Sequence, residues 1–208
     1  MMKIESVAAQ PDRAGRHRVC FEDGTIMRLY RQTVQDFGLY AGKEMTQESF
    51  SDLQIAAGEM SARMRAVRIV SATSVSKGDL QRRLVQKGES PENANRAVQW
   101  MSDMQFIDDN KTAEQIVRKC AAKGYGIARA KHALYEKHIP KECWDAALAE
   151  YPDQIESIVS YMRTHLREGW DRRDLQKVTN GLLQRGHSFS DIRRGLQALS
   201  LEDGFLED

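Results

Sequence analysis

The chain has 208 residues, 41% of them hydrophobic and 29% charged, which is the composition of a globular protein long enough to bury a core. Its 31 lysines and arginines nearly balance its 30 acidic residues, so any nucleic-acid contact would be a local patch and not a property of the whole molecule. Three distant cysteines exclude a disulfide framework, and no apolar run approaches the roughly 20 residues of a membrane span. We therefore expect a cytoplasmic protein.

Residues 1–45 have the pattern of a small β-rich cap. Two short runs, residues 16–21 and 25–30, are separated by Glu22-Asp23-Gly24. An Asp-Gly pair between two such runs predicts a hairpin, because glycine tolerates the positive φ of a tight turn. A short helix is expected over residues 31–37, ending at Gly38.

The pattern becomes helical from about residue 46 onward. Thr46 is placed to cap a helix, and an apolar period follows through Phe50, Leu53, Ile55 and Ala57. Further helix starts are indicated where Ser76 precedes Asp79, where Asp171 precedes Asp174, and at Ser90-Pro91.

Three leucines, Leu84, Leu134 and Leu182, mark an internal repeat. Ten, fourteen and seventeen residues after them come Ala94, Trp144 and Ile192, then Val98, Leu148 and Leu196, then Met101, Tyr151 and Leu199. These offsets share one face of a helix. A cation follows each leucine by three residues, and the next residue is suited to a helix end: Lys87-Gly88, Lys137-His138 and Arg185-Gly186.

Each repeat is expected to contain these two helices and one helix before them. The leading helices carry Val67 and Val70 in the first unit, Ile116, Val117 and Cys120 in the second, and Ile158, Val159, Met162 and Leu166 in the third. The sequence therefore predicts a mainly α protein, a tandem array of three three-helix units with a small β-rich N-terminal cap. The expected limits are 1–45 for the cap, 46–110 for the first unit with its lead-in helix, 111–152 for the second and 153–208 for the third.

Catalytic and metal-binding chemistry is not indicated. Asp108-Asp109 could pair around a metal, but the helix that follows makes a capping role the better interpretation. Gly124-Tyr125-Gly126 follows a helix and lacks the Gly-Lys-Ser/Thr of a phosphate loop, so a tight turn is expected. His132 and Glu136 share a helix face without a recognisable zinc pair. We expect no enzyme, no metal and no cofactor.

The aromatic and histidine residues are assigned mainly structural roles. Trp144 occupies a repeat core position, whereas Trp100 and Trp170 are candidates for partial exposure and base stacking. The remaining, isolated histidines are expected at the surface or in turns: His17, His165 and His187.

Several stretches together resemble the bacterial regulatory protein RecX family. The stretch from Asp79-Leu80 through Arg82-Arg83-Leu84 to Lys87-Gly88, followed by Ile107-Asp108-Asp109, is similar to its signature of an acidic residue and leucine, a basic pair, Leu, Lys-Gly and Asp-Asp. Arg118 before Gly124-Tyr125-Gly126, and Leu183-Gln184-Arg185-Gly186, resemble its later stretches. The resemblance covers about residues 63–199.

The resemblance implies a regulator that binds the RecA recombinase filament on single-stranded DNA and inhibits strand exchange, ATP hydrolysis and co-protease activity. Two residues depart from the family pattern. His138 replaces a glycine, which suggests a different helix end, and His187 replaces an aromatic residue, which suggests a looser packing contact.

Basic residues near helix ends are the candidates for partner or filament binding: Arg82, Arg83, Lys87, Lys137, Arg172, Arg173 and Arg185. Arg82, Arg83 and Lys87 are expected to face solvent, with Leu80, Leu84 and Val85 directed inward. A role confined to the helix dipole also fits Lys87, Lys137 and Arg185. We expect a monomer with a RecA filament as its partner, single- or double-stranded DNA as a further partner, and no membrane. The alternative is a sequence-nonspecific DNA-binding protein built from helix-turn-helix-like repeats.

Overall fold

The computed structural model describes residues 1–166 and 169–202, which fall into two compact bodies. The N-terminal body comprises residues 1–74 and 80–106, and the C-terminal body comprises residues 75–79 and 107–208. Within the described ranges, no helix combines the length and the apolar character required to cross a bilayer.

The N-terminal body begins with a four-stranded antiparallel sheet and a short helix. Their bounds are β1 (Met2–Val7), β2 (Arg16–Phe21), β3 (Ile26–Tyr30), α1 (Arg31–Asp36) and β4 (Glu44–Met45), and the strand order is β3-β2-β1-β4. The β2–β3 hairpin turns at Gly24, with φ +85°, and Gly38, with φ +51°, follows α1. Both predictions are confirmed. The pairing of β1 with β4 extends the hairpin into a sheet.

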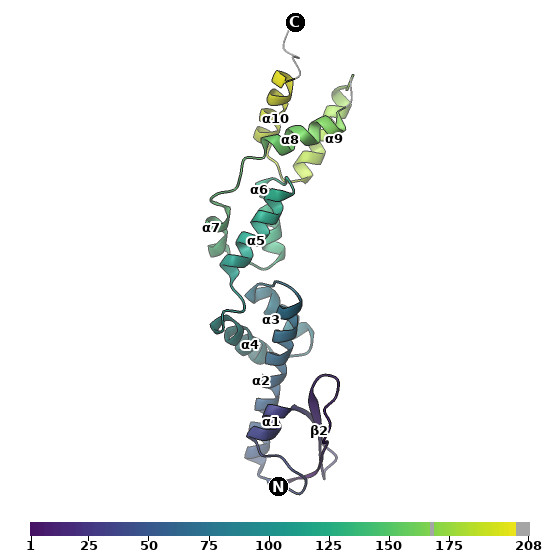
Figure 1. Ribbon diagram of the computed structural model, residues 1–208, viewed down its shortest axis with the longest axis vertical. Coiled ribbons are helices and arrows are strands. Elements are labelled where there is room, and N and C mark those ends of the chain that lie inside the picture. The colour runs from purple at the N-terminus through teal and green to yellow at the C-terminus, as the bar shows by residue number, and fades with distance from the viewer. Residues whose placement is uncertain (167–168, 203–208) are drawn as a thin grey trace. The chain divides into compact units, whose positions relative to one another are not determined.

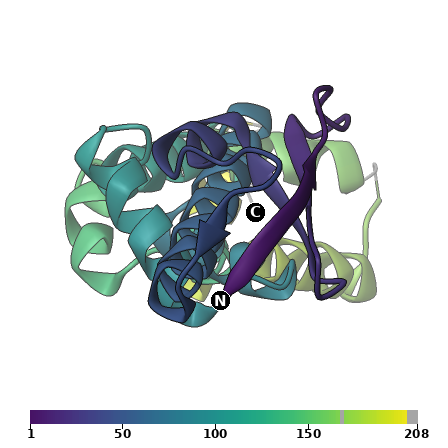
Figure 2. The ribbon, with the colours of Figure 1, turned by 90° about the horizontal axis from the view of Figure 1, so that it is seen from below.

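The inner face of this sheet packs against α1 and the first turns of α2 (Gln47–Ala72), as Figures 1 and 2 show with the strands in purple to blue. Ile4, Phe21 and Leu29 from the strands meet Phe50 and Leu53 from the helix. The rings of Phe21 and Phe50 meet edge to face, with their centroids 5.2 Å apart. The cap and the first long helix therefore share one core.

The helix α2 begins as predicted, but its buried face differs from the prediction. The Thr46 hydroxyl accepts the Ser49 N–H at 3.1 Å, which confirms the cap. The expected apolar position Ile55 is 55% exposed. In the last turns the buried residues are Ala62, Ala66 and Ile69, while Val67 and Val70 are only half-buried. The spacing of four and three residues between the buried positions defines the face, and Val67 and Val70 stand beside it.

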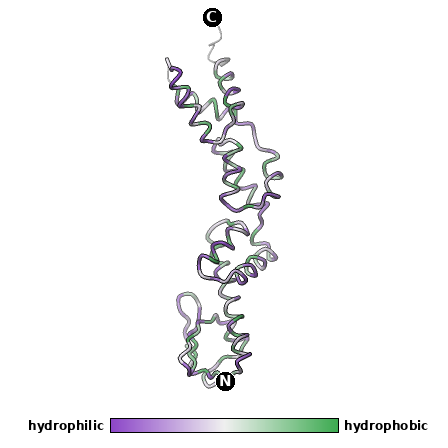
Figure 3. The backbone as a smooth tube through the Cα atoms, turned by 180° about the vertical axis from the view of Figure 1, so that it is seen from behind, coloured by the Kyte–Doolittle hydropathy of each residue, from purple (hydrophilic) through white to green (hydrophobic). Residues whose placement is uncertain are grey.

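The remaining helices complete three successive groups of three. Their bounds are α3 (Lys77–Gln86), α4 (Pro91–Asp103), α5 (Asp109–Ala122), α6 (Ile127–Glu136), a 3₁₀ turn η1 (Lys141–Cys143), α7 (Trp144–Leu148), α8 (Ile155–His165), α9 (Arg172–Gln184) and α10 (Phe189–Glu202). Each helix contains both hydrophobic and hydrophilic residues along its length, as amphipathic helices do (Figure 3). The predicted fold class is confirmed, while the limits expected for separate domains stay a prediction.

The three repeat leucines are each completely buried, at 0% exposure. At each of them the helix ends with the same backbone pattern. The N–H of the residue five positions later donates a 3.1 Å hydrogen bond to the carbonyl of Leu84, Leu134 or Leu182. This is the Schellman arrangement, which satisfies carbonyls left over at a helix C-terminus.

The residue in the left-handed conformation of this arrangement is Gly88, His138 or Gly186, with φ of +90°, +52° and +86°. His138 therefore adopts the same backbone as the two glycines, and the expectation of a different helix end was wrong. Because His138 carries a side chain, the left-handed conformation lowers the stability of the second unit by about 1–2 kcal/mol.

Candidate interaction surface

Two helix ends meet backbone to backbone where α9 reaches α6 in the C-terminal body. The Gly126 N–H donates to the Arg185 carbonyl at 3.0 Å, and the Ala128 N–H donates to the Gly186 carbonyl at 3.3 Å. A Cβ atom on Gly126 would lie only 2.0 Å from the Gly186 carbonyl oxygen. The C-terminus of α9 thus caps the N-terminus of α6, and only glycine permits this approach.

A second junction of the same kind joins α6 to the start of α3. The Ser76 hydroxyl donates to the Lys137 carbonyl at 2.6 Å and accepts the Asp79 N–H at 3.0 Å. A Cβ atom on Gly78 would lie 3.0 Å from the His138 carbonyl oxygen. At both junctions a helix C-terminus faces a helix N-terminus, so opposite ends of two helix dipoles meet.

The Asp108-Asp109 pair caps helices. Asp108 accepts the N–H groups of Asn110 and Lys111 at 2.9 and 3.2 Å, and the second of these bonds is the main cause that lowers its pKa. Asp109 is buried and accepts the Lys77 N–H at 2.9 Å, so it caps α3 instead of its own helix; burial raises its pKa. Among the described residues, no three His, Cys, Asp or Glu side chains gather as metal ligands would.

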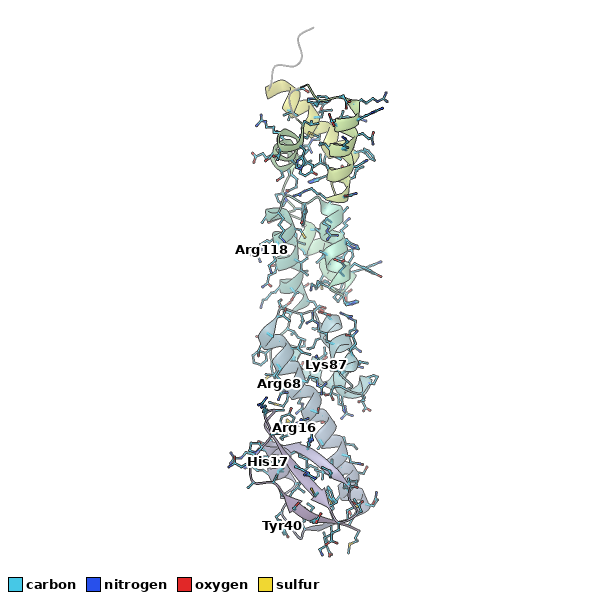
Figure 4. All side chains as sticks on the ribbon, turned by 90° about the vertical axis from the view of Figure 1, so that its right-hand side faces the viewer. Arg16, His17, Tyr40, Arg68, Lys87 and Arg118 are labelled. Carbon is cyan, nitrogen blue, oxygen red and sulfur yellow. The ribbon has the colours of Figure 1, made fainter. Side chains whose placement is uncertain are left out.

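Of the cations that follow the three repeat leucines, Lys87 and Lys137 are exposed, whereas the side chain of Arg185 packs against the protein. Lys87 and Lys137 lie at the surface just past the ends of α3 and α6 (Lys87 in Figure 4). The guanidinium group of Arg185 lies 5.0 Å from the ring centre of Tyr125 and 5.2 Å from that of Tyr161. It also donates to the Lys123 carbonyl at 2.9 Å. The repeat therefore conserves the position of the charge but not its environment.

The basic pair on α3 departs partly from the prediction. Arg82 is exposed, Arg83 is half-buried, and both interact within the protein. Leu80 and Leu84 are buried as expected, but Val85 is 41% exposed. Val85 was wrongly assigned to the inward face because it adjoins Leu84 in sequence, although neighbours on a helix are 100° apart in direction.

Arg172 and Arg173 are the first two residues of α9, and both are exposed. The predicted cap before them is confirmed as a complete capping box between Asp171 and Asp174. Cations at a helix N-terminus oppose the helix dipole. The dipole therefore explains Lys87 and Lys137 but not this pair.

A polar hollow of about 460 Å³ lies beside α8, and the sequence patterns did not indicate it. Its lining includes Ser157, Ser160 and Thr164 of α8, with Lys123 and Arg185 from the neighbouring helix ends. The signal that was available is the spacing of the hydroxyls, three and then four residues apart, which places them on one helix face.

His187 was expected at the surface or in a turn; it lies in the loop that follows the end of α9, where it is buried. Its Nε2–H donates to the Gly124 carbonyl at 3.1 Å, beside the α9–α6 junction. Burial is the main cause that lowers its pKa; Arg185 also lowers it, and Asp191 raises it.

We expect the free energy of unfolding to fall as the pH drops below about 6.5, because His187 binds a proton more readily in the unfolded chain. This contribution is fully present above the unfolded pKa and is lost as the pH falls through the lower folded pKa. Urea unfolding at several pH values between 5 and 8 would measure it. His187→Phe should flatten this part of the pH profile. An unchanged profile in His187→Phe would contradict the assignment.

Trp100 and Trp170 are partly exposed, as expected, but Trp144 is itself only half-buried. Trp144 packs against the core of the second unit, and its Nε1–H donates to the Ile139 carbonyl at 3.0 Å. Trp100 is half-buried with the guanidinium of Arg63 at 5.7 Å from its ring centre, and Trp170 is 41% exposed.

Several known proteins with similar sequences or folds carry the name RecX. The family model for RecX, second three-helix domain, matches residues 108–148. The regulatory protein RecX of Vibrio campbellii is 26% identical over 153 residues, which cover 72% of this chain and 97% of the relative. That of Clostridium acetobutylicum is 22% identical over 209 residues, which cover 96% of this chain and 97% of the relative.

Solved structures agree with the fold. A crystal structure of regulatory protein RecX aligns with a TM-score of 0.68 and 22% identity, covering 93% of this chain and all of the other. RecX from Lactobacillus salivarius aligns with a TM-score of 0.64, covering 70% of this chain and 99% of the other. Together with the three-helix groups and the repeated helix ends, these matches confirm the predicted resemblance of the chain to regulatory proteins of the RecX family.

Proposed function

We propose that this protein binds RecA recombinase filaments and inhibits their recombination, ATPase and co-protease activities. It would act as a cytoplasmic monomer in DNA repair and the SOS response. Support comes from the resemblance to the RecX family and from relatives named regulatory protein RecX that align over nearly their whole length.

The structural observation that supports it best is the repeated helix end. Leu84, Leu134 and Leu182 each begin the same backbone arrangement, and each is followed three residues later by a cation, which is exposed in the first two units. A filament offers identical binding sites at regular intervals. A chain that repeats one surface feature is suited to such a partner, because linked weak contacts multiply in affinity.

The proposal predicts that reversing two exposed cations weakens inhibition. With Lys87→Glu and Lys137→Glu combined, the protein concentration that halves ATP hydrolysis by RecA on single-stranded DNA should rise roughly tenfold. Each reversal removes one surface attraction and adds a repulsion, at about 0.7 kcal/mol per site. Steady-state ATPase titrations would measure the effect.

Lys119→Glu is the matched control, because Lys119 is likewise an exposed cation near the C-terminus of a helix. It carries the same cost against the helix dipole but lies outside the repeated position. Inhibition by the double variant equal to that by Lys119→Glu would count against the proposed surface. A wild-type chain that leaves RecA hydrolysis unchanged would overturn the proposed function.

Sequence-nonspecific DNA binding through the helical repeats remains the second candidate, and Arg172 and Arg173 favour it because the helix dipole does not explain them. The two functions separate on naked duplex DNA. If DNA binding is the function, affinity for duplex DNA should fall steeply with salt, at a slope of about 0.9 per phosphate neutralised. Filament regulation does not require such binding.

A further inference from the structure

The outer face of the N-terminal sheet carries two arginines that face each other. Arg18 of β2 and Arg28 of β3 are directly opposite in the register of the hairpin, and both are exposed. Like charges at opposite positions of two strands destabilise a sheet. Among the described residues, neither guanidinium group has a hydrogen bond or an ion pair. Arg16, at the start of β2, differs because its guanidinium group donates to the Asp12 carboxylate at 2.8 and 3.0 Å. The sheet therefore holds two cations side by side that the fold does not neutralise.

The strand that carries Arg28 is an edge of the sheet. Within the described residues, the order β3-β2-β1-β4 leaves β3 with one neighbouring strand. The Phe21 N–H donates to the Thr25 carbonyl at 2.9 Å, and from such a pair onward successive residues alternate between bonding across the hairpin and pointing away from it. Arg28 comes three residues after Thr25, so its N–H and carbonyl point away from β2. The Arg18 carbonyl fits this alternation, because it accepts the Ala8 N–H on the side away from β3. The outer edge of β3 therefore offers backbone groups to a further strand.

The side chains of β3 divide the edge into a basic and an apolar side. Ile26 and Arg28 are exposed on the outer face, whereas Leu29 is buried on the inner face. Met27 also belongs to the inner face, where it packs against the core of the cap, but it is only half-buried. A strand added along β3 would place every second side chain beside Arg28 and the intervening ones beside Met27. The edge therefore suits an extended segment in which acidic and apolar residues alternate.

We propose that β3 binds an extended acidic segment of a partner protein, which adds to the sheet as a fifth strand. Its carboxylates lie opposite Arg28, where Arg18 adds to the positive charge, and its alternate apolar side chains contact Met27. Strand addition takes affinity from main-chain hydrogen bonds and specificity from alternate side chains. A nucleic acid would meet the two arginines but has no main chain to pair with the edge. This binding uses neither Lys87 nor Lys137, so it goes beyond the proposed function and can fail independently of it.

Charged residues on an edge strand also keep sheets from pairing with one another and aggregating. That role is served by a charge of either sign, and it does not explain a second arginine opposite the first. Arg28→Glu separates the two roles, because glutamate keeps a charge on the edge and turns the repulsion from Arg18 into attraction. A second copy of this chain is a poor occupant, since antiparallel pairing of two β3 strands would bring their central arginines together.

The test is binding of a fluorescein-labelled peptide of alternating glutamate and valine to the full chain, followed by anisotropy. The wild type should prefer this peptide to one of alternating lysine and valine. Arg28→Glu should weaken binding about tenfold, because one surface attraction becomes a repulsion. Arg18→Glu combined with Arg28→Glu should reverse the preference toward the lysine peptide. Circular dichroism should show that Arg28→Glu does not lower the thermal midpoint.

Two N-methylated peptides test the backbone pairing. In the proposed register the glutamate N–H groups bond to β3, and the valine N–H groups point away from it. Methylation of the glutamate nitrogens should therefore abolish most of the binding, whereas methylation of the valine nitrogens should preserve it. Arg13→Glu is the control variant, because Arg13 is an exposed arginine of the loop between β1 and β2 and should not affect binding.

Equal peptide affinity in wild type and Arg28→Glu would overturn the proposal, as would equal binding of the two methylated peptides. An oligothymidylate that loses as much affinity as the peptide in Arg28→Glu would assign the surface to phosphates instead. Sedimentation of the wild type as a dimer that Arg28→Glu dissociates would assign it to a second copy of the chain. Either result would replace the acidic segment as the occupant of the edge.

Discussion

Gly126→Ala is expected to lower the free energy of unfolding by about 2–6 kcal/mol. The new methyl group would lie 2.0 Å from the Gly186 carbonyl oxygen and 2.4 Å from the His187 nitrogen, both of them backbone atoms that cannot rotate away. The helix ends must therefore separate. Overpacking costs about 1–3 kcal/mol, and each of the two backbone hydrogen bonds lost adds about 0.5–1.5 kcal/mol. Urea unfolding followed by circular dichroism would measure the loss.

Gly88→Ala provides the matched control for this substitution. Gly88 has a φ of +90°, but no atom lies within 4 Å of the Cβ position. The cost there is the left-handed backbone alone, about 1–2 kcal/mol. If both substitutions cost the same, the close contact between α9 and α6 does not exist as described.

Leu134→Ala is expected to destabilise the protein by about 2–5 kcal/mol. Leu134 is completely buried in the core of the second unit, where it packs with Ala130, Val117 and Leu148. Removing its branched end leaves a cavity that rigid helices fill only partly. Thermal and urea unfolding at neutral pH would show the decrease.

The neighbouring residue is the control for this core substitution. Tyr135 follows Leu134 on the same helix but is 69% exposed, so Tyr135→Ala should change stability by no more than about 0.5 kcal/mol. A comparable loss from both substitutions would mean that helix propensity, and not burial, stabilises α6.

The repeat was predictable because it is local. The leucine that ends each middle helix, the left-handed residue after it and the apolar offsets beyond it all lie within eighteen residues of sequence. Leu84, Leu134 and Leu182 are accordingly buried, and Gly88 and Gly186 are left-handed, as predicted. Ile55 was misplaced because several registers of an apolar face are compatible with an alanine-rich helix.

Contacts between distant segments were not predictable from these patterns. Asp109 was expected to cap its own helix, but it accepts the N–H of Lys77, the first residue of α3. This cap depends on the contact between two helices and not on the local sequence. The burial of His187 depends on the Gly124 carbonyl, which comes from the preceding unit. The hollow beside α8 likewise joins Lys123, Ser160 and Arg185, which no local period connects.

The junction between α9 and α6 has a consequence for how the sequences of such repeats evolve. It is made by main-chain N–H and carbonyl groups, which every residue except proline possesses, and it requires glycine only at Gly126 and Gly186. A copied segment could therefore dock on its parent without new matching side chains. After duplication, most surface positions are free to drift. This is consistent with relatives that keep the fold at 22% identity.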